Sequence, residues 1–433
     1  MNKEPIISGR MMFYGESALH TTFLKITLKD YPDLDLLQKA VDEAVRHYPW
    51  VTYGVREERG LFYFRDNLPR SIKITEWNDE NPPVLGSKET DGHLFGVFFH
   101  GRNLYFSIFH GLTDAGGVKA FLDCALGCYR SLLKEEPFIF TEPEYPDMEA
   151  EPFLAINKAM SEAGVVWGFK GLEAMLKKTV LVWRRNYDAH KASLSSEDVP
   201  KSFFIRIDES EFMGFVKNLG VKPSAALVAL YSAAFLKVHP EAQSNIKVAL
   251  PVDYRSVLGI PHTFRDCTMP PAMFRFKIHR DENIKDMAAR INQIIMQITK
   301  PKEKFFAVKE YSVYMNLIPR LSYHWTNAIL SRTVSLDRFP FTFVCSYAHR
   351  FIDESYLDLV EQMYVMNPAY GPVPVLEIIA MPDRFCISLT QNSSTEVYIR
   401  AFIEQLKLNR ISACLVETIN AAVQRVDLRT DII

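Results

Sequence analysis

The residues best suited to chemistry in this chain are a histidine and an aspartate four positions apart, His110 and Asp114. A neutral imidazole accepts a proton near neutral pH and can therefore act as a general base. Asp114 stands where an N-cap belongs, because its carboxylate can accept the free N–H groups of a following helix. Gly116 and Gly117 come next and let a second group approach the backbone. A base beside the N-terminus of a helix suits acyl-transfer chemistry.

The surrounding elements predict that His110 lies at the end of a strand. Residues 104–109 are rich in aromatic and aliphatic side chains, which is typical of a buried strand. A helical pattern of apolar residues starts directly after the glycines, at Val118, Phe121, Leu122, Ala125 and Leu126. The turn between strand and helix must therefore be short. Taken alone, the motif is more often a core histidine followed by an ordinary helix cap, so the rest of the chain has to decide.

The spacing His-x-x-x-Asp resembles the active-site motif of the condensation-domain and BAHD acyltransferase superfamily. That superfamily includes the alcohol O-acetyltransferases and, more distantly, chloramphenicol acetyltransferase. Its motif ends a strand and carries a glycine after the aspartate and another further on; here Ala115 takes the first position and Gly117 keeps the second. Phe109 precedes His110, where condensation domains often have a second histidine. The resemblance is closest to bacterial alcohol O-acetyltransferase-like proteins.

A second segment strengthens this resemblance. Residues 251–255 read Pro-Val-Asp-Tyr-Arg, similar to the P-V-[DN]-x-R segment of the family, and they follow a predicted helix at 223–238 and a strand at 246–251. In the family the arginine of this segment pairs with the aspartate of the motif. The resemblance therefore implies an ion pair between Asp114 and Arg255, with Asp114 holding His110 through its loop. A guanidinium fork suits a partly buried carboxylate.

Two further segments match the family in part. Residues 263–266, Thr-Phe-Arg-Asp, resemble the T-x-R-N-F segment of alcohol acetyltransferase-like proteins, with Asp266 where asparagine is usual. Residues 341–351 take the place of the S-N-x-G strand, in which Ser346 is kept while Tyr347 and His349 replace asparagine and glycine. The departures at Tyr347 and His349 concern the acceptor rather than the fold.

The oxyanion formed during acyl transfer needs a hydrogen-bond donor. Two candidates remain open at this stage. One is Ser346, through its place in the S-N-x-G segment. The other is the backbone N–H groups near Gly116 and Gly117, and we also expect these two glycines to bind the acyl donor.

The totals limit the classes of function. Lys and Arg number 50 and Asp and Glu 52, so the formal charge of −2 gives no field for nucleic acid or for an anionic membrane. The first 20 residues lack a basic region followed by an apolar run, so we expect no secretory signal and a cytoplasmic location. The six cysteines form no Cys-x-x-Cys pair and are expected to be reduced and mostly buried.

The length of 433 residues and the order of elements predict two lobes. The N-terminal lobe, 1–185, carries the His110 motif, and the C-terminal lobe, 186–433, carries Arg255. We expect an α/β (α+β) protein with two chloramphenicol-acetyltransferase-like lobes, each a mixed sheet with flanking helices, and an active site in a tunnel between them. In the first lobe, strands are predicted at 20–28, 50–55, 61–65, 71–77, 94–99 and 104–109 and a helix at 34–47. In the second, strands are predicted at 202–207, 272–278 and 341–351, hairpin strands at 362–366, 375–381 and 385–392, and helices at 209–219, 283–298 and 395–408.

Residues 163–183 are unusually apolar. Lys170, Glu173, Lys177 and Lys178 interrupt the segment too often for a membrane-spanning helix. We expect an amphipathic helix that packs on the other lobe or lines an apolar entrance, with superficial membrane contact as the alternative.

The resemblance implies an acyltransferase that moves an acyl group, acetyl first among them, from acyl-CoA to an alcohol, with His110 as general base. One alternative is a freestanding condensation-type enzyme that takes its acyl group from carrier-protein phosphopantetheine, with that acyl carrier protein as partner. Another is a non-catalytic binding scaffold of the same fold, suggested by Ala115, Tyr347 and His349. No His and Cys cluster has metal-ligand spacing, so no metal is expected. No Gly-x-Ser-x-Gly, phosphate-loop or dinucleotide pattern occurs, which argues against hydrolase, nucleotidase and dehydrogenase functions.

Overall fold

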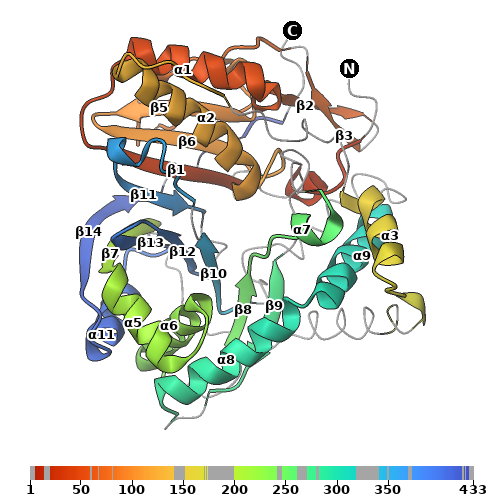
Figure 1. Ribbon diagram of the computed structural model, residues 1–433, viewed down its shortest axis with the longest axis vertical. Coiled ribbons are helices and arrows are strands. Elements are labelled where there is room, and N and C mark those ends of the chain that lie inside the picture. The colour runs from red at the N-terminus through yellow and green to blue at the C-terminus, as the bar shows by residue number, and fades with distance from the viewer. Residues whose placement is uncertain are drawn as a thin grey trace.

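The computed structural model shows two lobes, each built on its own β-sheet (Figure 1). It describes residues 5–13, 20–58, 61–66, 68–79, 81–140, 152–169, 171, 173, 199–240, 246–260, 271–278, 282–317, 341–348, 351–368, 373–421, 424 and 426–428. The expected fold class, an α/β protein with two sheet-and-helix lobes, is confirmed.

The first sheet has five strands in the order β11-β1-β6-β5-β4. They are β1 (Thr21–Leu28), β4 (Thr75–Glu76), β5 (Phe95–His100), β6 (Asn103–Phe109) and β11 (Val360–Met366). Strand β1 pairs antiparallel with β6 on one side and with β11 on the other. The C-terminal half of the chain thus supplies an edge strand to the N-terminal sheet.

Two helices, α1 (Leu34–His47) and α2 (Ala115–Leu133), lie side by side and bury their apolar faces in the core of the first lobe. Helix α1 begins behind Asp33, whose carboxylate accepts the N–H of Leu36 at 3.0 Å. A short 3-10 turn, η3 (Pro49–Thr52), leads into a hairpin of β2 (Gly54–Glu58) and β3 (Leu61–Arg65).

The second sheet has seven strands in the order β14-β7-β13-β12-β10-β8-β9. They are β7 (Lys201–Asp208), β8 (Ile246–Leu250), β9 (Ala272–Phe276), β10 (Phe343–Ala348), β12 (Val375–Ala380), β13 (Arg384–Gln391) and β14 (Ala413–Asn420). Strand β10 runs parallel to β8 and β12, and the other pairs are antiparallel. The core of this lobe includes residues of four helices: α5 (Glu209–Leu219), α6 (Pro223–Val238), α8 (Ile284–Ile298) and α11 (Val397–Leu408).

A third group of helices carries the segment that reaches the first lobe. Helices α3 (Pro152–Glu162), α7 (Arg255–Leu258) and α9 (Pro301–Leu317) pack together beside the two sheets (Figure 1). Their small apolar core includes Tyr254, Leu258 and Phe305. The hydroxyl of Tyr311 on α9 donates to the carbonyl of Ser8 at 2.9 Å. Ser8 immediately precedes the 3-10 turn η1 (Gly9–Phe13), so this helix group is tied to the start of the described chain.

Many predicted elements are found within a residue or two of their expected bounds, and the helices at 34–47, 209–219 and 223–238 match at both ends. The strand predicted at 71–77 is reduced to β4, and the first hairpin strand begins at Gly54 because residues 49–52 form a 3-10 turn. The three strands β11, β12 and β13 do not form a run of hairpins: β12 and β13 pair, but β11 joins β1. Helices α3 and α9 and strand β14 were not predicted.

Several sequence predictions fall outside the described residues. They are most of the helix expected at 163–183, the segment 263–266, His349 and the lobe boundary at 185/186. In the part of the chain that is described, no single helix is long and apolar enough to cross a membrane, and α5 and α6 pass that test only together, across a bend of 94°.

The turn that bears His110 packs closely on η1. A Cβ added at Gly9 would lie 2.2 Å from the carbonyl oxygen of Gly111, so one backbone would have to move. We expect Gly9→Ala to lower the free energy of unfolding by about 1–3 kcal/mol, as measured by urea titration. Gly214→Ala in α5 is the control, because its Cβ would meet nothing within 4 Å. Equal losses in the two variants would contradict this close approach.

Candidate active site

His110 lies directly after β6, at the point where the chain leaves the first sheet. Its backbone N–H donates to the carbonyl of His20 at 2.6 Å, which extends the pairing of β1 and β6 by one residue. Its ring Nδ1 lies 2.8 Å from the carbonyl oxygen of Thr113. A carbonyl only accepts, so Nδ1 carries the hydrogen and the neutral ring keeps its lone pair on Nε2. The half-buried imidazole is therefore held in the tautomer that a base acting through Nε2 requires.

Asp114 caps α2, as the sequence predicted. Its Oδ1 accepts the N–H of Gly117 at 3.0 Å. The guanidinium of Arg255 approaches the same carboxylate with both terminal nitrogens, with Nη1 2.8 Å from Oδ2 and Nη2 bonded to Oδ1. The predicted ion pair between Asp114 and Arg255 is thus present as a two-pronged contact, and the side chains are 25% and 11% exposed.

The electrostatics of Asp114 follow from these contacts. Burial alone would raise the pKa of its carboxyl group, but Arg255 and the Gly117 N–H outweigh burial and hold that pKa below its ordinary value. The carboxylate therefore stays ionised at neutral pH. Its hydrogen bonds to Gly117 and Arg255 hold the turn between β6 and α2 in place.

Gly116 makes room for the arginine. A Cβ at this position would lie 2.8 Å from Nη1 of Arg255, so the guanidinium rests against the bare backbone of the first helical turn. The N–H of Gly117 is already bound to Asp114. The structure therefore gives both glycines a role in the ion pair, and their contact with an acyl donor stays a prediction.

Arg255 is positioned by contacts with residues of its own half of the chain. It opens the short helix α7, and its backbone N–H donates to Oδ1 of Asp253 at 3.0 Å. Lys304 on α9 donates to the carbonyl of Asp253 at 2.8 Å. The loop before α7 is thus fastened to α9, and the guanidinium projects from it toward the first lobe.

A second histidine, His20, lies next to His110. Burial, with a smaller contribution from His110, lowers the pKa of His20 to about 4, so its ring is neutral at pH 7. The sequence gives one local signal for His20, its place at the start of the strand predicted at 20–28. Only the register of β1 against β6, with Thr21 opposite Phe109, places His20 at His110.

Ser346 belongs to another polar group, on β10. It stands opposite Glu377 of β12 in the parallel register. The amide Nδ2 of Asn367 donates to Oε1 of Glu377 at 2.5 Å, and Oδ1 of Asn367 accepts from the hydroxyl of Thr22 on β1. Burial raises the pKa of Glu377 to about 7, against the opposing influence of Asn367 and Ser346. The structure thus brings His110, Asp114, Gly116, Gly117 and Arg255 into one group and Ser346 into this second one.

Tyr347, one of the departures from the family's pattern, points to the opposite face of β10. Its ring lies 6.1 Å from that of Phe385, at the core of the second lobe, and burial raises its pKa to about 12. This departure therefore changes the packing of the lobe on the side of the sheet that does not carry Ser346.

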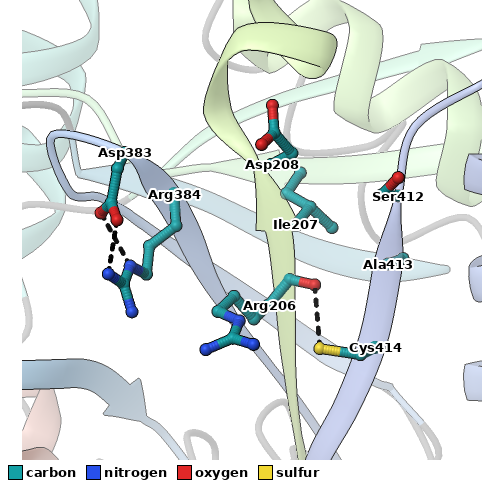
Figure 2. A pocket seen from close by; sticks show the side chains of 8 residues that line it. All are labelled: Arg206, Ile207, Asp208, Asp383, Arg384, Ser412, Ala413 and Cys414. Atoms are coloured by element: carbon teal, nitrogen blue, oxygen red, sulfur yellow. Dashed lines mark hydrogen bonds and ion pairs between the residues drawn. The ribbon is translucent and has the colours of Figure 1, made fainter.

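A groove with a volume of about 390 Å³ lies elsewhere, at the ends of β7, β13 and β14 (Figure 2). Its carboxylates already have partners: Asp383 accepts from Nε of Arg384 at 2.7 Å, and Asp208 caps α5 through the N–H of Glu211 at 2.9 Å. The groove offers neither a histidine nor an unengaged carboxylate as a base. The predicted tunnel beside His110 stays a prediction.

Among the described residues, no group of three or more His, Cys, Asp or Glu side chains is placed to hold a metal ion.

Solved structures identify the fold. The chain is similar to the trichothecene 15-O-acetyltransferase TRI3 from Fusarium sporotrichioides, with a TM-score of 0.63, 12% identity and 93% of each chain covered. It is similar to TRI101 of F. sporotrichioides, solved with coenzyme A and T-2, with a TM-score of 0.55, 12% identity, and 93% of this chain and 97% of that chain covered. It is also similar to the condensation domain of the monacolin K polyketide synthase MokA, with a TM-score of 0.59, 10% identity, and 93% and 96% covered. No protein-family model matches the chain, and no curated protein matches it by sequence.

These similarities show that the chain has the two-lobed fold shared by condensation domains and CoA-dependent acetyltransferases. At sequence identities of 10–12%, this similarity establishes the fold and does not establish the activity or the substrate.

The two-pronged contact of Arg255 can be tested by a charge-conserving change. Lysine keeps the charge but cannot reach both carboxylate oxygens in a fork, so we expect Arg255→Lys to lower the free energy of unfolding by about 1.5–3 kcal/mol. Arg384→Lys is the matched control, because Arg384 forms a similar fork with the exposed Asp383 and should cost less than about 1 kcal/mol. Urea titration of both variants measures the difference, and equal losses would count against a special role for Arg255.

The buried carboxyl of Glu377 predicts how stability depends on pH. Its pKa rises from 4.5 in the unfolded chain to about 7 in the fold, so between these values the folded state binds more protons than the unfolded state. This group's contribution to stability is therefore full below pH 4.5 and declines as pH rises through about 7, by roughly 3 kcal/mol in all. We expect Glu377→Gln to remove this decline in urea titrations repeated across that range. A decline of the same size in the variant would contradict the assignment to Glu377.

Proposed function

We propose that this protein is an acyltransferase that moves an acyl group, acetyl first among them, from acyl-CoA to the hydroxyl group of a small molecule, with His110 as general base. One observation carries the proposal. An imidazole held through Nδ1 stands on a turn that an ion pair between Asp114 and Arg255 ties to the other lobe.

The reaction needs two proton transfers and no covalent enzyme intermediate. Nε2 of His110 takes the hydroxyl proton of the acceptor as its oxygen attacks the thioester carbonyl. The tetrahedral oxyanion then collapses, the C–S bond breaks, and the imidazolium returns the proton to the leaving thiolate. Because His20 is neutral, it adds no positive charge beside the imidazolium.

The oxyanion donor in this proposal is Ser346. The N–H groups near Gly116 and Gly117 are the alternative donors, of which the Gly117 N–H is already bonded to Asp114. Asp114 and Arg255 act in this scheme through the turn, as positioning residues.

A carrier-protein thioester is the second candidate donor, because the condensation domain of a polyketide synthase shares the fold. The two donors contain the same phosphopantetheine arm. Product formation with acetyl-CoA alone supports the first, and a requirement for an acylated carrier protein supports the second.

The base is tested by His110→Ala. We expect the rate of acyl transfer to fall by about 10² to 10⁴, because a positioned general base contributes a factor of that size. Release of CoA thiol from acetyl-CoA, measured over a panel of alcohols, gives the rate. The control is His100→Ala, which removes an exposed imidazole at the end of β5 and should leave the rate unchanged. An unchanged rate in His110→Ala would leave a non-catalytic scaffold as the better account.

A further inference from the structure

Gln424 is a buried polar residue that the scheme above does not use. It is 0% exposed and lies beyond β14 of the second sheet. Ala421, between the two, is still tied to the second lobe, because its N–H donates to the carbonyl of Pro200 at 2.8 Å. Gln424 itself bonds to β1 and β6 of the first sheet. The chain therefore crosses from one lobe to the other between Ala421 and Gln424.

Three hydrogen bonds hold Gln424 in the first lobe. Its Oε1 accepts from the hydroxyl of Ser107 on β6, and its Nε2 donates to the carbonyl of Pro83 at 2.5 Å. Its backbone carbonyl accepts from the hydroxyl of Thr21 on β1 at 3.4 Å. Ser107 and Thr21 are themselves fully buried, and a buried hydroxyl without a partner is costly. Gln424 thus supplies a partner to one buried hydroxyl on each of the two strands.

These two strands are the ones that carry the base. Thr21 stands opposite Phe109 in the antiparallel register, and His110 directly follows Phe109. The carbonyl of His20, the residue before Thr21, accepts the backbone N–H of His110 at 2.6 Å. Ser107 lies on β6 shortly before His110. Gln424 therefore bonds to β1 and to β6 close to the backbone that bears the imidazole.

The chain beyond Gln424 contacts the loop that leads into β5. The N–H of Asp427 donates to the carbonyl of Leu85 at 2.7 Å. A Cβ added at Gly86 would lie 2.3 Å from the carbonyl oxygen of Asp427, so the two backbones are in close contact. The same loop ends at Leu94, whose carbonyl accepts the N–H of Phe109 at 2.9 Å. The segment after β14 thus reaches the residue before the base from the β5 side of β6 as well.

We propose that Gln424 is a positioning residue for His110, because it holds together the parts of β1 and β6 that carry the base. A fully buried side chain does not touch a substrate, so its influence passes through these two strands. A displacement of a catalytic group by about 1 Å can cost about a hundredfold in rate, so a small relaxation of the strands is sufficient. This inference rests on the proposed acyl transfer and deepens it by extending the support of the base to the segment that follows β14.

The test compares two buried glutamines. Gln424→Met keeps the length of the side chain but removes its hydrogen bonds, so kcat for acyl transfer should fall by about tenfold to a hundredfold while KM for acetyl-CoA stays unchanged. Gln391→Met is the matched control, because Gln391 is 3% exposed and donates to the carbonyls of Ser393 and Thr395 in the second lobe. It should leave kcat unchanged. An unchanged kcat in Gln424→Met, or an equal fall in both variants, overturns the proposal.

A milder variant keeps the proposal testable where Gln424→Met fails to fold. Ser107→Ala removes only the hydroxyl that donates to Gln424, so kcat should fall by about threefold to tenfold. In the double variant the two losses should not multiply, because both changes break the same hydrogen bond. Losses that multiply in full would overturn the link through Ser107.

A second readout needs no substrate and separates this inference from the proposed function. In protein carrying isotope-labelled histidine, the Nδ1–H that His110 donates to Thr113 gives an imidazole NMR signal, identified by its loss in His110→Ala. Gln424→Met should shift or broaden this signal, and Gln391→Met should leave it in place. A displaced signal in a protein that transfers no acyl group would support the role of Gln424 and reject the acyltransferase proposal. A signal that Gln424→Met leaves in place overturns the positioning role.

Discussion

The structure depends on one ion pair between residues 141 positions apart, Asp114 and Arg255. Asp114 caps α2 and Arg255 begins α7, so this ion pair joins the helix that follows His110 to the helix group of the other half. The ion pair is partly buried, so removing one of its two charges would leave the other poorly solvated and would lower the stability of the fold. Gly116 leaves room for the guanidinium because it has no side chain. Lys304 holds the loop before α7 by donating a hydrogen bond to the carbonyl of Asp253.

The proposed chemistry follows from how firmly the turn is held. Thr113 fixes the imidazole tautomer, His20 fixes the backbone of His110, and Gly111 packs on Gly9. Across the lobes, Asn367 joins Thr22 of the first sheet to Glu377 of the second.

Features that depend on neighbouring residues in the sequence could be predicted from short sequence patterns. Asp114 was recognised as a cap from the sequence around it, and Arg255 from a short segment that resembles a family motif. The sequence could not show that β11 joins β1, because strand pairing over more than 300 residues leaves no local pattern. His20 and Glu377 were missed for the same reason: each acquires its role from a residue on a neighbouring strand. Helix α9 has apolar residues on all sides, and β14 is largely exposed, so neither shows the periodicity that identifies an element.

The most direct test of this account is a double-mutant cycle on the free energy of unfolding, with Asp114→Asn, Arg255→Gln and the double variant. Because either single change leaves one member of the pair without its partner, the double variant should be more stable than the sum of the two losses predicts, by at least about 1 kcal/mol. Losses that add to within about 0.5 kcal/mol would show that the two residues do not act as a pair, and the support for His110 would have to be sought elsewhere.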